Sequence, residues 1–108
     1  MTLYHGSNMA VVKPDLNFSR KNLDFGAGFY TTENKVQAVD FARKVMIRKG
    51  GKNQKASVYD FDMNTSEAML DILRFQTPDR FVFKSDKALS LLKYVDSFEP
   101  IAEQLYDS

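Results

Sequence analysis

The sequence predicts a single α+β domain that spans residues 1–108. Two short segments, Leu3–Ser7 and Asp24–Thr32, each predict a strand that ends in or is flanked by glycine. A segment with apolar residues at helical spacing follows directly after the second of them. The chain has nine Phe and five Tyr, and 44% of its residues are apolar, which is enough for one hydrophobic core.

The first quarter of the chain predicts a strand, a loop and a second strand. Residues 2–5 are expected to form the first strand. Residues 8–23 contain Pro14 among many turn-forming side chains and predict a long loop. A loop of that length in a small domain is usually functional or disordered. Residues 24–28 predict a turn that leads into the strand at residues 29–32.

The most regular element is a helix after this second strand. Thr32 is expected to cap it, and Glu33 suits the positive end of its dipole. Gly50 and Gly51 are expected to end it. The apolar residues that recur at helical spacing are Ala38, Phe41, Ala42, Val45 and Met46.

The second half of the chain is less regular. Residues 56–62 alternate apolar and polar side chains and predict a strand. Residues 65–75 agree with a helix or with a bulged strand, and both alternatives stay open. After a break at Pro78, residues 80–84 predict another strand.

Two helices are expected at the carboxyl end. Asp86 is expected to cap the first of them. Its apolar residues would be Ala88, Leu89, Leu92 and Val95. Residues 100–106 predict a short final helix.

Composition excludes several classes of protein. Fifteen basic and 14 acidic residues give a net charge of +1, too small a field to favour nucleic acid as a partner. With no cysteine and one histidine, the chain predicts neither disulfides nor a metal site. No signal peptide is recognisable, and no apolar run approaches the roughly 20 residues of a membrane span. We therefore expect a cytoplasmic protein with no membrane partner.

The candidate functional residues near the start of the chain have ordinary structural explanations when each is taken alone. A single histidine at a strand end, such as His5, is more often structural than catalytic. A tyrosine within a strand, such as Tyr30, is more often part of the core. The neighbouring glycines could serve tight turns.

In combination, these residues resemble the ADP-ribosyltransferases of the diphtheria-toxin and poly(ADP-ribose) polymerase type. That group carries a His-Tyr-Glu triad on three strands. Its His-Gly-Ser or His-Gly-Thr motif is matched by residues 5–7, and its Phe-Gly-x-Gly-x-Tyr motif by residues 25–30. A second aromatic residue follows eleven positions after the triad tyrosine, which is Phe41 here.

The chain most resembles a bacterial family of uncharacterised proteins with this fold. Its members typically read Leu-Tyr-His-Gly-Ser, Pro-Asp-Leu, Asp-Phe-Gly-x-Gly-Phe-Tyr-Thr-Thr and Gln-Ala-x-x-Phe-Ala. These motifs stand at residues 3–7, 14–16, 24–32 and 37–42. The resemblance implies a split, mostly antiparallel sheet with one main helix, here in a shortened form because few residues separate the strand near residue 62 from the one at residue 80.

The resemblance also implies a site for NAD, the substrate of these enzymes. Gly6 would approach the carboxamide of nicotinamide, and Tyr30 and Phe41 would stack on its ring. His5 would bind a ribose. The hydroxyl of Ser7 would bind the amide, and Thr31 is a further binding candidate. The pyrophosphate would meet a loop with three cationic side chains, Lys13, Arg20 and Lys21.

The third member of the triad is replaced. Alignment on the last strand puts Arg80 where the resembled enzymes carry a Glu or Gln, so His5, Tyr30 and Arg80 occupy the catalytic positions. A guanidinium would repel the oxocarbenium-like transition state that a carboxylate stabilises.

Three interpretations remain open. The chain is an NAD-dependent mono-ADP-ribosyltransferase acting on a protein or nucleic acid, or a catalytically impaired module that binds NAD, ADP-ribose or a protein partner, or a domain without a ligand. The short middle region favours a homodimer over a monomer, because a sheet that has lost a strand leaves an edge open to pairing.

Overall fold

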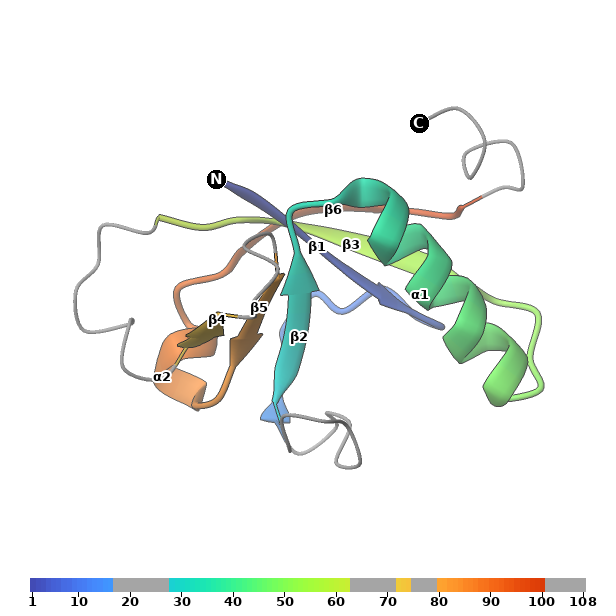
Figure 1. The fold of residues 1–108 in the computed structure, drawn as a ribbon, viewed down its shortest axis with the longest axis horizontal. Coiled ribbons are helices and arrows are strands. Elements are labelled where there is room, and N and C mark those ends of the chain that lie inside the picture. Colours follow the sequence, from blue (N-terminus) through green and yellow to red (C-terminus); the bar gives the residue numbers. More distant parts are fainter. Residues whose placement is uncertain (17–27, 63–71, 75–79, 101–108) are drawn as a thin grey trace.

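A computed structural model of the chain describes residues 1–16, 28–62, 72–74 and 80–100. Figure 1 shows the arrangement of these elements. In chain order they are β1 (Thr2–Ser7), β2 (Phe29–Thr32), α1 (Lys35–Arg48), β3 (Lys55–Asp60), β4 (Ile72–Arg74), β5 (Arg80–Phe83), α2 (Asp86–Leu89) and β6 (Lys93–Phe98). The predicted α+β class, with an antiparallel sheet and one main helix, is confirmed.

The described strands form one sheet in the order β4-β5-β2-β1-β3-β6, and every neighbouring pair is antiparallel. β1 pairs with β3 along its full length. It meets β2 only at Tyr4, which lies opposite Thr32. The hydrogen-bonded ladder is therefore narrowest between β1 and β2, and Figure 1 shows these two strands running in clearly different directions.

An aromatic core lies on one face of the sheet. Segment 8–16 packs on this face and is held at Val11. The N–H of Val11 donates to the Ser57 hydroxyl at 2.9 Å, and the Tyr59 hydroxyl donates to the Val11 carbonyl at 2.5 Å. Burial raises the pKa of Tyr59, which keeps this hydroxyl protonated. The buried residues of the core are Leu3, Phe29, Tyr59, Phe61, Phe81, Phe83, Ala88, Leu89 and Leu92.

Helix α1 covers the opposite face of β1. Successive strand residues point to opposite faces, so Gly6 faces away from the core residue Leu3. A Cβ atom on Gly6 would lie 2.1 Å from the Ala38 carbonyl oxygen and 2.7 Å from the Ala42 nitrogen, both in α1. The backbones of helix and strand are therefore in direct contact at this glycine.

The predicted helix is present, but its first turn is capped two residues later than expected. The side chain of Asn34 accepts hydrogen bonds from the N–H groups of Val36 and Gln37 at 3.0 and 3.3 Å. Thr32 is instead the last residue of β2, and its hydroxyl accepts from the Asn34 N–H at 3.0 Å. The end of the helix is as predicted, because Gly50 adopts a φ of 66° just beyond it.

The expected helix from residue 86 through Val95 is wrong. Ser85, not Asp86, caps α2, and α2 ends at Leu89. The following residues form β6, which pairs with the outer edge of β3. Val95 is 61% exposed in that strand rather than part of a helical core face. Pairing with β3 thus outweighs a helical spacing that only four residues supported.

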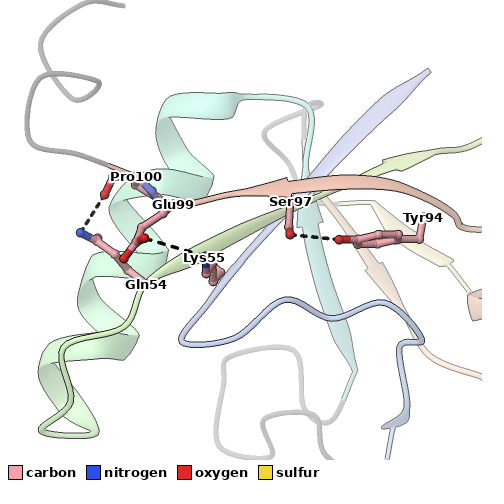
Figure 2. Close-up of polar contacts among 6 residues, drawn as sticks. All are labelled: Gln54, Lys55, Tyr94, Ser97, Glu99 and Pro100. Atoms are coloured by element: carbon pink, nitrogen blue, oxygen red, sulfur yellow. Dashed lines mark hydrogen bonds and ion pairs between the residues drawn. The ribbon is translucent and has the colours of Figure 1, made fainter.

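Polar contacts hold the end of β6 against the start of β3 (Figure 2). Gln54 Nε2 donates to the Pro100 carbonyl at 3.0 Å, and Lys55 Nζ lies 3.9 Å from a Glu99 carboxylate oxygen. Within β6, the Tyr94 hydroxyl donates to the Ser97 hydroxyl at 3.0 Å.

Other sequence predictions fall wholly or partly outside the described residues. Of segment 65–75, the structure describes only residues 72–74, which form β4. The predicted turn at residues 24–28 is described only at Gly28, and the predicted helix at residues 100–106 only at Pro100. In the described part of the chain, no helix combines the length and apolarity that crossing a membrane requires.

Candidate functional site

The register of β2 and β5 puts Tyr30 and Arg80 on one face of the sheet. Arg80 lies directly opposite Thr32, and Tyr30 is two residues before Thr32 in β2, so the three side chains share a face. Diagonal neighbours of this kind have backbones about 7–8 Å apart, within reach of long side chains. This is the face that carries Gly6 and α1.

A cleft of about 230 Å³, here called the narrow cleft, lies between this face and α1. It collects residues from four elements that are far apart in the sequence. Those that the sequence singled out are Gly6, Tyr30, Thr31, Phe41 and Arg80. Tyr30 and Phe41 are half-buried, so both rings keep exposed surface in the cleft.

A second cleft of about 550 Å³, the wide cleft, adjoins the first. The two share Gly6, Tyr30 and Phe41 among their lining residues. The wide cleft adds His5 and Ser7 from β1. The residues proposed to bind the nicotinamide and its ribose therefore line one cleft or both.

His5 bonds to the backbone rather than the side chain of Tyr30. Its Nδ1 lies 2.7 Å from the Tyr30 carbonyl oxygen, and its ring stacks on Phe29 with centroids 4.1 Å apart and planes 22° apart. Strand alternation turns the His5 side chain to the face opposite that of Tyr30. The imidazole thus bridges β1 and β2 where their ladder is narrowest.

The hydrogen bond of His5 determines its tautomer. A carbonyl oxygen only accepts, so Nδ1 carries the proton and Nε2 is left as an acceptor. Burial lowers the pKa of His5 from 6.5 to about 4, against the opposing effect of its bond to Tyr30. At neutral pH His5 is an uncharged ring that can accept a hydrogen bond from a hydroxyl.

Two of the predicted ligand contacts are engaged within the protein. The Thr31 hydroxyl donates to the Phe81 carbonyl at 3.1 Å, which ties β2 to β5. The Ser7 hydroxyl donates to Asn8 Oδ1 at 3.3 Å. Gly6 likewise has a structural reason to be glycine, because α1 fills the space of its missing side chain.

Arg80 is held by a neutral partner. Its Nε donates to Gln37 Oε1 at 2.9 Å, and the Thr32 hydroxyl donates to the same oxygen at 3.2 Å. Among the described residues, Arg80 takes part in no ion pair. Gln37 is a site residue to which sequence reasoning assigned no role. The available signal was its position one helical turn before Phe41, which puts both on one side of α1.

Arg80 stands at the position where the resembled enzymes carry a carboxylate, so a carboxylate would have to come from another residue of the cleft. Asp40 lines the narrow cleft, but its carboxylate lies 3.0 Å from Lys44 Nζ in a pair one turn along α1. Both side chains are largely exposed, at 45% and 68%.

Further cations line the wide cleft. Lys13 borders it from segment 8–16 and Lys49 from the end of α1, whereas Arg20 and Lys21 lie outside the described residues. Asp15 lies in the same lining. Sequence reasoning did not propose Lys49 as a site residue, although it stands two helical turns after Phe41.

Comparison with known proteins identifies one family. A family model described as "protein of unknown function (DUF3990)" matches residues 1–82. The matched region contains β1, β2 and α1 and extends to Val82 in β5, so it includes Arg80. No curated protein and no solved structure matched the chain. A match over this much of the sequence places the chain in the DUF3990 family of proteins of unknown function.

Proposed function

We propose that this protein is an NAD-binding module of the ADP-ribosyltransferase type whose transferase activity is impaired. The nicotinamide ring would occupy the narrow cleft, and the ADP-ribose part would extend along the wide one. The observation that carries the proposal is that Gly6, Tyr30 and Phe41, from three separate elements, line both clefts and form their junction.

The dimensions of α1 agree with such a ligand. Phe41, Val45 and Lys49 all line the wide cleft and recur every four residues. Eight residues of helix span about 12 Å. A flat ring near Phe41 and a phosphate near Lys49 would thus lie at opposite ends of one groove, with Lys13 as a second cation for the phosphates.

His5 would contribute as a hydrogen-bond acceptor. Its Nε2 is unprotonated, because the ring proton lies on Nδ1 in the bond to the Tyr30 carbonyl. A ribose hydroxyl in the wide cleft could donate to it. The low pKa of His5 keeps this acceptor available throughout the neutral range.

The impaired activity follows from Arg80. Cleavage of the bond between nicotinamide and ribose develops positive charge on the ribose, which a carboxylate stabilises and a guanidinium opposes. Among the described residues that line the narrow cleft, Asp40 carries the carboxylate, and it is paired with Lys44. These charges favour a binding module over an efficient transferase.

Titration calorimetry with NAD tests the proposal. Wild type should bind, and Tyr30→Ala should lose about 1 kcal/mol or more because the stacking surface is removed. Tyr30→Phe keeps the ring and should bind almost as well as wild type. Absence of binding at millimolar NAD would refute the proposal, and equal binding by Tyr30→Ala would move the site away from these clefts.

A further inference from the structure

Arg80 differs from the other charged groups of the narrow cleft in how it is held. Arg80 is exposed, and its backbone position opposite Thr32 and its Nε bond to Gln37 direct the guanidinium to the face that carries Tyr30. Gln37 is itself fixed by the hydroxyl of Thr32. A three-residue network thus orients one cationic group at the ring end of the clefts.

The hydrogen bond to Gln37, here called the anchor, uses the Nε–H side of the guanidinium and leaves its two terminal NH₂ groups for other partners. A guanidinium has an Nε–H and two terminal NH₂ groups in one plane. With Nε–H bound to Gln37, the two terminal groups form an end-on fork of parallel donors, the arrangement that matches a carboxylate. Among the described residues, Gln37 is the polar partner of this side chain.

The anchor also leaves the charge of Arg80 without an ion-pair partner among the described residues. Gln37 is neutral, so it positions the guanidinium without neutralising it. The carboxylate of Asp40 is shared with Lys44 at 3.0 Å. The described part of the narrow cleft therefore carries two cations and one anion, with the excess positive charge at Arg80.

We propose that the narrow cleft selects an aromatic ring that bears a carboxylate, in the form of a dinucleotide whose pyridine ring carries a carboxylate in place of the carboxamide of NAD. Arg80 binds that carboxylate end-on, and Gln37 is its positioning residue. The inference rests on the proposed function, because it uses the same site for the ring. A pyridinium ring alone is repelled by a nearby guanidinium, whereas a carboxylate on the ring offsets that repulsion.

The test compares two dinucleotides that differ only in this group, NAD and its deamidated form. Titration of wild type at neutral pH and low salt should show at least tenfold tighter binding of the carboxylate form. Arg80→Gln should bind the two about equally. Gln37→Met keeps the guanidinium but removes its anchor, and it should reduce the ratio of the two affinities.

Arg43→Gln is the control for net charge, since it removes an exposed cation of α1 that lines neither cleft. Its ratio of affinities should stay as in wild type. An equal loss of selectivity in Arg43→Gln and Arg80→Gln would assign the effect to net charge and overturn the role of Arg80. Equal affinities in wild type would overturn the inference and leave NAD binding intact, whereas binding of neither dinucleotide would refute the proposed function as well.

Discussion

His5 shows how burial determines the chemistry of a single residue. Its pKa falls to about 4 because the surroundings disfavour the imidazolium, although the bond to Tyr30 partly offsets this effect. The residue that the resemblance places in a catalytic triad is thus a neutral link between β1 and β2, with Nε2 as an acceptor.

The shift makes stability depend on pH in a defined window. The unfolded chain takes up the proton of His5 near pH 6.5, whereas the folded chain does so near pH 4. The contribution of neutral His5 to the free energy of unfolding is therefore fully present above pH 6.5. The free energy of unfolding should fall by about 3 kcal/mol as the pH drops to 4. Urea unfolding between pH 7 and 4.5 measures the loss. His5→Asn keeps a donor for Tyr30 but does not titrate, so a loss of the same size in that variant would contradict the assignment.

Gly6 is required by contact between backbones. Gly6→Ala would put a methyl group 2.1 Å from the Ala38 carbonyl oxygen, so α1 has to move away from β1. Overpacking of this kind costs about 1–3 kcal/mol, and here rigid backbone lies on the other side. Gly51→Ala is the control, because nothing lies within 4 Å of its added methyl. Thermal unfolding should show a large decrease for the first variant and little change for the second.

At the scale of elements, the first turn of α1 links helix formation to the site. Asn34 caps the helix through the N–H groups of Val36 and Gln37, and the side chain of Gln37 holds Arg80. The stability of this turn and the position of the guanidinium are therefore coupled.

Asn34→Ala should lower the free energy of unfolding by about 1 kcal/mol, as loss of a helix cap commonly does. Urea unfolding measures the decrease. Glu33→Ala, at the exposed neighbouring position, is the control and should stay within about 0.5 kcal/mol of wild type. An unchanged Asn34→Ala would mean that the cap contributes nothing to folding.

The sequence predicted those elements whose signal is local. Apolar spacing and the glycine pair predicted α1, and β-forming runs predicted β1, β2 and β5. The cap moved from Thr32 to Asn34 because the Thr32 backbone is committed to β2. The first part of β6, up to Val95, was predicted as helix, because its pairing with β3 joins residues 33 to 42 positions apart that no local pattern reveals.

The sequence indicated which residues form the candidate site but not the contacts that those residues make. The motifs singled out His5, Tyr30 and Phe41, and the structure places these residues in the lining of two adjoining clefts. The bond between Gln37 and Arg80 was beyond prediction because it joins side chains 43 residues apart. The prediction for Gly6 was incomplete. The sequence does not distinguish a glycine that lets a ligand approach the backbone from one that lets a helix pack against it.

At the scale of the whole molecule, the region matched by the family model is shorter than the folded domain. The match ends at Val82, but α2 and β6 lie beyond it. Leu89 and Leu92 are buried in the aromatic core, and β6 covers an edge of β3. The residues after the match therefore complete the aromatic core and extend the sheet.

The central claim is that this fold binds NAD with Arg80 in the place of a catalytic carboxylate. Release of nicotinamide from labelled NAD, by wild type and by Arg80→Glu, tests it most directly. An electrostatic contact of this kind is commonly worth about 10²–10³ in rate. Wild type should release little nicotinamide, and Arg80→Glu should release clearly more at equal NAD occupancy. Robust release by wild type, unchanged in Arg80→Glu, would contradict the account.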